Sequence, residues 1–379
     1  MRVTSAVLVE PGASRPYTDS APLALETLEL DSPGAGELLI RVRAAGLCHS
    51  DLSTLDGTRP RPMPMALGHE AAGEVLEVGA GVAGFAPGDH VVLAFVPSCG
   101  ECAPCRGGRP ALCEPGAVAN GEGVLLGGRG RLRRADGAPV HHHLGVSAFS
   151  DHVVVSARSA VHIDADLPWE IAALFGCAVL TGVGAAVNAA RVALGDSVAV
   201  FGLGGVGLAA LMGALASGAS PVFAVDREAA KLALAEELGA TRAIDAADDP
   251  VATIRELSGG GVRHAIETVG KGAVLAQAYE ATARGGTTTT VGLPHPSESF
   301  AVPAVTLTAE ERTVQGCYLG SCIPSRDIPR FVRLYKEGRL PVDRLLTHVL
   351  GPDEINAGFE RLASGDGVRQ VVLFPDEAG

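Results

Sequence analysis

Lysine is scarce in this chain of 379 residues. Lys and Arg total 30, but only three of them are lysines, namely Lys231, Lys271 and Lys336. The 43 Asp and Glu residues outnumber the bases and give a formal net charge of −13. The nearest approach to a basic cluster is 129–134, a short arginine-containing run that we interpret as a solvated loop. Because phosphate binding needs clustered Lys and Arg, we expect no nucleic-acid partner.

The sequence also shows no pattern typical of a secretory leader or of a membrane span. The first ten residues lack a basic segment followed by an apolar core, so we expect no signal peptide. Two uncharged runs, 171–190 and 197–225, exceed the eighteen residues that indicate a spanning helix. The second run contains glycines from Gly202 to Gly218 and Pro221, which would break such a helix. Alternating buried strands and helices explain both runs better, so we expect a cytoplasmic protein without a membrane partner.

The length suggests two domains, and the texture of the chain changes near Trp169. Before that point, short β-branched runs such as 38–42, 73–78 and 90–95 are separated by Pro- and Gly-rich turns, which predicts a barrel or sandwich. After it, apolar runs alternate with Ala- and Leu-rich helical stretches, which predicts a parallel sheet with crossover helices. The expected strands are 198–201, 221–225, 263–268 and 287–291, and the helices 206–216, 228–238 and 273–282. Two more helices, 325–337 and 352–363, and a strand near 369–374 are expected at the C-terminal end.

Four of the eight cysteines lie within fifteen residues. Cys99, Cys102 and Cys105 are spaced by two residues each, and Cys113 follows in the same loop. In a cytosolic chain such cysteines are more typical of metal ligands or buried thiols than of disulfides. Four thiolates can close tetrahedrally around one zinc ion. The loop therefore predicts a structural zinc site.

A glycine-rich segment predicts a dinucleotide site. The segment lies between an expected strand and an expected helix and matches the pattern G-x-G-x-x-G. Its residues are Gly202, Gly204, Gly205, Val206 and Gly207. Such glycines let the backbone approach a pyrophosphate over the helix N-terminus. Asp226 follows Gly207 by nineteen residues, where a carboxylate would accept hydrogen bonds from ribose hydroxyls and favour NAD over NADP. The adjacent Arg227 would soften that preference.

A thiol, an imidazole and two carboxylates lie close together earlier in the chain. Cys48 and Asp51 precede His69 and Glu70 by about twenty residues. Taken alone, Cys48 and His69 are as compatible with a buried thiol and a satisfied histidine as with a metal site. A remote Cys177, where the β-rich part ends, would complete a two-cysteine, one-histidine zinc site with an open fourth position. Asp51 would then accept the second N–H of His69 and fix its tautomer.

With these motifs in place, the sequence resembles the zinc-dependent medium-chain alcohol dehydrogenases over essentially its whole length. The segments that carry the resemblance are GLCHSD, LGHEAAGEV, CGECAPC with the later Cys113, GCAVLTGVGAA, VFGLGGVGL, VDREAAK and GDGVRQVVLF. It implies an α/β fold in which a Rossmann doubly wound parallel sheet, 179–320, is inserted in a GroES-like β-rich catalytic domain, 1–178 and 321–379. Segment 115–145 resembles the extra loop of the longer animal and plant-type enzymes, which implies a homodimer, with a tetramer left open.

The resemblance also implies roles for individual residues. It implies two zinc ions per chain, a catalytic one held by Cys48, His69 and Cys177 and a structural one held by the four-cysteine loop, with NAD as cofactor. Ser50 would receive the proton of the substrate hydroxyl, and His49, Asp51 and Glu70 would support the catalytic centre. The cofactor would be bound by the glycine motif and by His49, Asp226, Arg227, Lys231, Val291 and Arg369, and the substrate pocket lined by Phe95, His143, Leu144, Leu293 and Tyr318.

Two positions depart from the family pattern. Ser53 stands where many relatives end the proton relay with a histidine, so the relay is shorter or His49 takes that place. His49 itself stands where many relatives place a pyrophosphate-binding arginine. A neutral imidazole should hold phosphates less tightly, and product NADH should leave faster.

The expected activity is reversible hydride transfer between NAD and a small primary alcohol, aryl or medium-chain, because three of the expected pocket residues carry aromatic rings. One alternative is a thiol-dependent formaldehyde dehydrogenase, but the acid and the arginine that such enzymes use are replaced in segments 58–61 and 114–117. Another is an enzyme of the same fold that holds NAD permanently. A non-enzymatic zinc-stapled scaffold is disfavoured because Cys48, His69 and Cys177 are all present.

Overall fold

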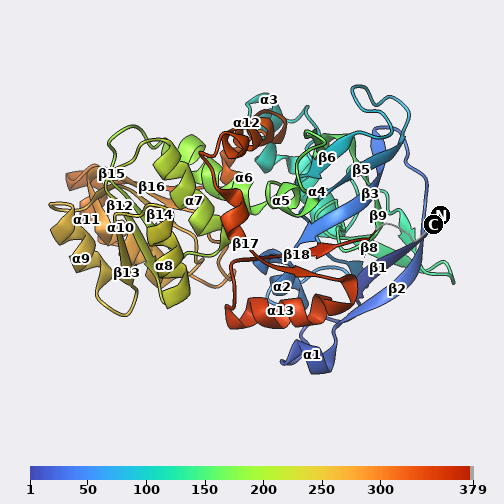
Figure 1. Ribbon diagram of the computed structural model, residues 1–379, viewed down its shortest axis with the longest axis horizontal. Helices are drawn as coiled ribbons and strands as arrows, with labels where there is room; N and C mark the ends of the chain where they lie inside the picture. Colours follow the sequence, from blue (N-terminus) through green and yellow to red (C-terminus); the bar gives the residue numbers. More distant parts are fainter. Residues whose placement is uncertain (376–379) are drawn as a thin grey trace. The chain divides into compact units, whose positions relative to one another are not determined.

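The computed structural model describes residues 1–375 and divides into two compact units. Unit 1 comprises Met1–Cys177, Ile323–Val332 and the chain from Leu346 onward, and unit 2 comprises Ala178–Cys322 and Arg333–Leu345. Both are drawn in Figure 1. No helix in the described part of the chain is long and apolar enough to cross a membrane.

Unit 1 is mostly β-structure, as the alternation of short apolar runs and turns predicts. A closed barrel joins β1 (Arg2–Leu8), β2 (Leu23–Leu30), β7 (Leu132–Arg133), β8 (Pro139–His142) and β4 (Met65–Ala66). A second sheet runs in the order β10 (Ala160–His162), β6 (His90–Leu93), β5 (Ala71–Val78), β3 (Glu37–Gly46), β18 (Arg369–Leu373) and β17 (Leu346–Leu350), with β9 (His152–Ser156) also pairing with β3. Strand β3 is buried over most of its length and β5 mainly in its first half, and both pack on one apolar core.

Short helices connect and flank the strands of unit 1. They are α1 (Tyr17–Ser20), α2 (His49–Leu55), α3 (Ala103–Arg106), η1 (Pro110–Leu112), α4 (Glu114–Glu122), η2 (Ala157–Ser159), α5 (Trp169–Leu174), η6 (Pro352–Glu354) and α13 (Ile355–Ser364). Helix α2 starts directly after the long strand β3, and Cys48 caps its N-terminus. This junction positions the residues singled out at 48–51.

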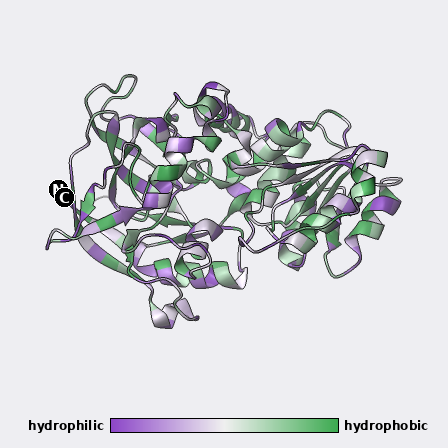
Figure 2. Ribbon diagram, turned by 180° about the vertical axis from the view of Figure 1, so that it is seen from behind, coloured by the Kyte–Doolittle hydropathy of each residue, from purple (hydrophilic) through white to green (hydrophobic). Residues whose placement is uncertain are grey.

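Unit 2 has the parallel sheet that the alternating pattern predicts. Its order is β13 (Arg242–Asp245), β12 (Val222–Asp226), β11 (Val198–Phe201), β14 (Val262–Glu267), β15 (Thr282–Thr290) and β16 (Thr313–Gly316), with every pairing parallel. This is the doubly wound order 3-2-1-4-5-6 of the Rossmann fold. The predicted Rossmann sheet is thereby confirmed. Figure 2 shows hydrophobic colouring along its strands, and β11 is buried at every residue.

The helices of unit 2 follow the crossover pattern. They are α6 (Ala178–Gly184), the π-helical η3 (Ala185–Ala190), α7 (Gly205–Ala216), α8 (Ala229–Glu237), α9 (Pro250–Leu257), α10 (Gly272–Ala281), α11 (Ala304–Ala309), η4 (Leu319–Ser321) and η5 (Val342–Leu345). The helix α12 (Pro324–Lys336) begins in unit 1, and its last turn groups with unit 2.

The expected domain boundaries stay a prediction; the compact units group one segment differently and shift the other ends by one or two residues. We assign 321–379 to the catalytic domain from the sequence, whereas Arg333–Leu345 groups with unit 2. Arg339 donates to the carbonyl of Ala216 on α7, and Arg344 forms an ion pair with Glu237 on α8. Leu340, Val342 and Leu345 are fully buried. These contacts across many residues of sequence have no local pattern that would predict them.

The arginine run 129–134 is largely solvent-exposed, as we expect from the sequence, but three of its arginines are paired with acids. Arg131 is largely buried and lies 2.8 Å from Glu37, and Arg134 lies 2.7 Å from Glu26. Arg133 forms an ion pair with Asp31. The acids come from β2 and from the loop and strand that follow it, so the run is neutralised within unit 1.

Candidate active site and cofactor sites

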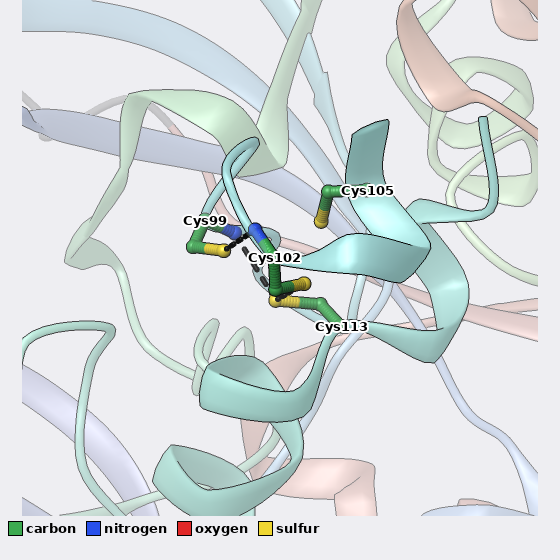
Figure 3. Close-up of side chains that lie close together, drawn as sticks. All are labelled: Cys99, Cys102, Cys105 and Cys113. Atoms are coloured by element: carbon green, nitrogen blue, oxygen red, sulfur yellow. Dashed lines mark hydrogen bonds between the residues drawn. The ribbon is translucent and has the colours of Figure 1, made fainter. Parts of the chain in front are cut away.

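The four cysteines of the 99–113 loop converge around α3 and η1, as Figure 3 shows. Their sulfur atoms all lie within 4.8 Å of one another. Backbone N–H groups of Glu101 and Cys102 donate to Cys99 Sγ, at 3.4 and 3.3 Å, and those of Cys99 and Gly116 donate to Cys113 Sγ, at 3.1 and 3.3 Å. Four sulfurs held together by the backbone fit a structural zinc ion.

The surroundings of the four cysteines favour the thiolate form of Cys99, at the N-terminal end of the loop. The backbone N–H groups of Glu101 and Cys102 lower the pKa of Cys99 to about 6. Burial raises the pKa of Cys105 to about 12 and also raises that of Cys113. Metal binding needs all four thiolates, and a dication offsets the cost of deprotonating the buried ones.

A second cluster joins Cys48, His69 and Cys177. These three residues are buried, and their ligand atoms also lie within 4.8 Å of one another. His69 Nε2 is buried and has no hydrogen-bond partner in the described chain. A hydrogen bond with Cys177 holds the pKa of Cys48 well below its ordinary value, against the effect of burial. Two sulfurs and an unpartnered imidazole nitrogen fit zinc, with three protein ligands as in catalytic rather than structural sites.

Asp51 lies behind His69, as the sequence predicts. It is fully buried, and its Oδ1 lies 3.1 Å from His69 Nδ1 and accepts the backbone N–H of Gly68 at 3.0 Å. Burial by itself would raise the pKa of Asp51, but the adjacent His69 and His143 lower it. In return, burial would lower the pKa of His69, but the Asp51 carboxylate raises it to about 10. A metal ion at Nε2 competes with the proton of that imidazole.

The sequence does not predict a further contact at Asp51. His143, which we expect only as a pocket-lining residue, is 2% exposed, and its Nδ1 lies 3.1 Å from the same Oδ1. The rings of His69 and His143 meet edge to face at 5.7 Å, and Phe95 packs edge-on against His69 at 5.1 Å. Because about seventy residues separate His69 from His143 in the chain, no local spacing points to this arrangement.

Glu70 and Arg369 form an ion pair in the interior of unit 1. Glu70 is fully buried and Arg369 is 4% exposed. Arg369 begins β18, which pairs with β3, and Gly46 at the end of β3 makes room for the pair. A Cβ at Gly46 would overlap the Glu70 carboxylate. The family resemblance implies that Arg369 binds pyrophosphate, and in the structure its guanidinium forms the ion pair with Glu70.

The remaining candidates of segment 48–53 lie on α2. His49 is exposed at the first position of the helix, and Ser50 and Ser53 are half-buried. The carbonyl of Ser50 accepts a hydrogen bond from the Thr54 hydroxyl at 3.3 Å. Ser50 therefore lies two residues from one member of the Cys48 cluster, with its hydroxyl on the first turn of the helix.

The glycine motif has the geometry of a dinucleotide-binding loop. Gly202 has a φ of +90°, and a Cβ at Gly207 would overlap the Gly202 carbonyl oxygen. A Cβ at Gly204 would meet nothing within 4 Å, so this glycine leaves open space beside the loop. Helix α7 has no side-chain cap, which leaves its first N–H groups available to an anion. The loop fits a pyrophosphate.

Asp226, at the end of β12, is tied to the glycine loop. Its Oδ2 accepts the N–H of Leu203 at 2.6 Å, and its Oδ1 accepts those of Arg227 and Glu228 at 2.8 and 3.0 Å. Two other expected cofactor-binding residues are Lys231 and Val291. Lys231 lies half-buried on α8. The N–H of Val291 donates to the Glu267 carbonyl. These residues all belong to unit 2.

The expected substrate-pocket residues fall in both units. Phe95, His143 and Leu144 belong to unit 1 and are buried, whereas Leu293 and Tyr318 belong to unit 2 and are 55% and 38% exposed. Their common pocket stays a prediction.

Comparison with known proteins identifies the class. Residues 34–165 match the model of the alcohol dehydrogenase GroES-like domain, and residues 205–337 match that of the zinc-binding dehydrogenases. The chain belongs to the zinc-dependent medium-chain alcohol dehydrogenase family of oxidoreductases, and the predicted GroES-like and Rossmann fold is confirmed. It is 39% identical over 377 residues to putative alcohol dehydrogenase D of Mycobacterium tuberculosis, covering 98% of this chain and all of the relative.

Two further relatives carry more specific names. An NDMA-dependent alcohol dehydrogenase of Amycolatopsis methanolica is 39% identical, covering 94% of this chain and 97% of the relative. A geraniol dehydrogenase of Castellaniella defragrans is also 39% identical, covering 93% of this chain and 95% of the relative.

Solved structures agree over the full length. A zinc-binding-domain alcohol dehydrogenase from Burkholderia ambifaria superposes with a TM-score of 0.94 at 37% identity, covering 99% of each chain. Benzyl alcohol dehydrogenase from Acinetobacter calcoaceticus superposes with a TM-score of 0.92 at 33% identity, covering 99% of this chain and 100% of that one.

Proposed function

We propose that this enzyme oxidises primary alcohols, aryl or medium-chain, to aldehydes with NAD, and reduces the aldehydes in the reverse direction. The observation that carries the proposal is the buried set of Cys48, His69 and Cys177 with an unpartnered His69 Nε2. The names of two relatives, a benzyl alcohol dehydrogenase and a geraniol dehydrogenase, support an aryl or extended alcohol as substrate.

In the proposed reaction, individual residues have different roles. Zinc held by Cys48, His69 and Cys177 would supply the Lewis acidity that lowers the pKa of an alcohol hydroxyl toward neutrality. Ser50, on the first turn of α2, receives the hydroxyl proton and passes it outward. Asp51 holds His69 in one tautomer through the 3.1 Å contact with Nδ1.

The proton step has a matched pair of variants. Ser50 and Ser53 are both half-buried on α2, one turn apart. Ser50→Ala should lower kcat by about 100-fold, because positioned proton transfer contributes on the order of 10²–10⁴ in rate. Ser53→Ala should change kcat by less than about threefold. Equal effects of the two substitutions would contradict the role of Ser50.

We infer that NAD is preferred over NADP. The Asp226 carboxylate lies at the end of β12 beside the glycine loop, where a 2′-phosphate would meet a negative charge. We expect kcat/KM to be at least about tenfold higher with NAD, which corresponds to about 1.4 kcal/mol. Asp226→Asn should narrow that ratio, and equal use of both cofactors by the unaltered enzyme would contradict the assignment.

The decisive experiment is a cofactor-reduction screen across aliphatic, allylic and benzylic alcohols, run on protein whose zinc content has been measured. The proposal predicts two zinc ions per chain and the highest kcat/KM with benzylic or medium-chain alcohols. If protein that contains two zinc ions per chain reduced NAD with none of these alcohols, the proposed activity would be refuted.

An NAD-retaining variant of the same chemistry is the second candidate, because one relative at 39% identity is named for dependence on an added compound, NDMA. NAD that stays bound through gel filtration would favour this reading. The thiol-dependent formaldehyde reaction would gain support only if a low-molecular-weight thiol stimulated formaldehyde oxidation.

The assembly and compartment that we propose are a homodimer in the cytoplasm. Among residues 1–375, strand β16 is at the edge of the parallel sheet and pairs with β15 alone, so its other edge can pair with a second copy. None of the eight cysteines forms a disulfide, which supports a reducing compartment. Light scattering should give twice the chain mass of 38.5 kDa, and a monomer would refute the dimer.

A further inference from the structure

His143 lies in a turn whose backbone is closed on itself. The turn follows β8, and the N–H of His143 donates to Ser147 Oγ at 3.0 Å. The His143 carbonyl accepts the N–H groups of Val146 and Ser147, at 3.0 and 3.1 Å. Leu144 and Ser147 both have left-handed backbone conformations, with φ of +51° and +57°. Non-glycine residues are held in that region only when their surroundings fix them, so the turn presents the His143 side chain in one position.

Both ring nitrogens of His143 face helix α2. Nδ1 lies 3.1 Å from Asp51 Oδ1, an ion-pair distance outside hydrogen-bond geometry, and Nε2 lies 3.4 Å from Thr54 Oγ1. An ionised carboxylate can only accept, so the proton of the neutral imidazole is assigned to Nδ1. Nε2 is then an acceptor and competes with the Ser50 carbonyl for the single Thr54 hydroxyl proton. The imidazole docks along one face of the helix and does not present a free nitrogen to a substrate.

Asp51 Oδ1 is where the two histidines meet. The same oxygen faces His69 Nδ1 at 3.1 Å, the N–H of Gly68 at 3.0 Å and His143 Nδ1 at 3.1 Å. Asp51 is fully buried, and its Oδ2 has no hydrogen-bond partner among residues 1–375. Burying a carboxylate is costly unless several donors surround it. Without His143, Asp51 Oδ1 would keep only its contacts with the N–H of Gly68 and with His69, the histidine whose ring it orients.

We propose that His143 is a positioning residue of the catalytic metal site: it lies against the same Asp51 oxygen as His69, holds the carboxylate in place and thereby fixes the orientation of the His69 ring. This inference rests on the zinc site of the proposed function and assigns to it a residue outside the ligand set. His143 acts through Asp51 and does not itself touch the metal. Loss of an outer partner of this kind weakens metal affinity by about 10- to 100-fold.

The variants are chosen so that the effect of losing side-chain packing can be distinguished from the effect of losing the polar nitrogens. His143→Phe keeps a planar ring of similar size and loses both nitrogens. His143→Asn is smaller but offers an N–H close to the position of Nδ1, so it should rescue Asp51. His141→Phe, two residues earlier and half-buried on β8, is the matched control.

The readout is zinc release from the zinc-loaded full chain to a chromogenic chelator, with the release phase of the catalytic site identified by its absence in Cys48→Ser. We expect His143→Phe to weaken zinc binding in that phase by tenfold or more and to leave the four-cysteine phase unchanged. His143→Asn should remain within about threefold of the unaltered protein, and so should His141→Phe.

Three results would overturn the inference. The first is an unchanged catalytic phase in His143→Phe, and the second is equal weakening by His143→Phe and His143→Asn. The third is equal weakening of both zinc phases, which would indicate general destabilisation of unit 1. Failure of the proposed function itself looks different, because the unaltered protein would then show no Cys48-dependent zinc phase at all.

Discussion

The Glu70–Arg369 ion pair should be one of the strongest single determinants of the stability of unit 1. Glu70 is fully buried and Arg369 is 4% exposed, so neither charge can regain water when its partner is removed. Removing one partner of a buried pair costs about 3–5 kcal/mol, whereas replacing both by apolar residues is often close to neutral. Arg369→Met and Glu70→Leu should therefore each destabilise unit 1 by about 3–5 kcal/mol. The double variant should lose far less than their sum.

Urea unfolding can measure this because the chain has a single tryptophan in the right unit. Trp169 lies on α5 of unit 1, where its ring packs against His90 at 4.2 Å. Its fluorescence should report the unfolding of unit 1. The control is Arg15→Met, which breaks the solvent-exposed pair with Glu360 and should change stability little.

The prediction fails in two ways. A loss below about 1 kcal/mol for Arg369→Met would mean that water or another group reaches Glu70 when the guanidinium is gone. Additive single losses in the double variant would mean that the two side chains are not energetically coupled.

Three further predictions concern pH, backbone conformation and cofactor release. Burial lowers the pKa of His142 to about 4, so the unfolded chain binds more protons than the folded chain between about pH 6.5 and 4. Unit 1 should therefore lose up to about 3.5 kcal/mol of stability as pH falls through that window, and His142→Gln should flatten this part of the Trp169 unfolding profile. Arg191 is exposed and has φ of +57° at the end of η3, so Arg191→Gly should stabilise unit 2 by about 0.5–1 kcal/mol in calorimetry, and an unchanged or lower transition would refute the strain. His49→Arg should slow NADH dissociation by about tenfold in stopped-flow fluorescence, because a guanidinium binds phosphate more tightly than a neutral imidazole, and an unchanged rate would contradict a role for His49 at the pyrophosphate.

The fold was predictable because its signals are local. Residues 198–201 form a strand, the glycine motif opens α7, and Asp226 ends β12, since each depends on a contiguous pattern of apolar residues and turns. The four-cysteine loop was predictable for the same reason. The segment Arg333–Leu345 was not, because its contacts with α7 and α8 join residues more than a hundred positions apart.

In the candidate site, too, some features were predictable and others were not. The resemblance placed Cys48, His69 and Cys177 together, and the structure brings their ligand atoms within 4.8 Å. It did not indicate that Arg369 faces Glu70 or that His143 faces Asp51. Both contacts depend on how side chains of distant strands and turns meet in the interior, which neither periodicity nor spacing reports.

The shared oxygen of Asp51 has a consequence for redesigning substrate range. Position 143 is an obvious target for anyone enlarging the pocket, because it precedes Leu144 in an expected pocket segment. Yet His143 and His69 approach the same carboxylate oxygen at 3.1 Å. A library at position 143 would select simultaneously for substrate fit and for retention of metal. Variants recovered with altered specificity should thus be enriched in side chains that place a donor beside Asp51, and a wider search would do better to vary Leu144 first.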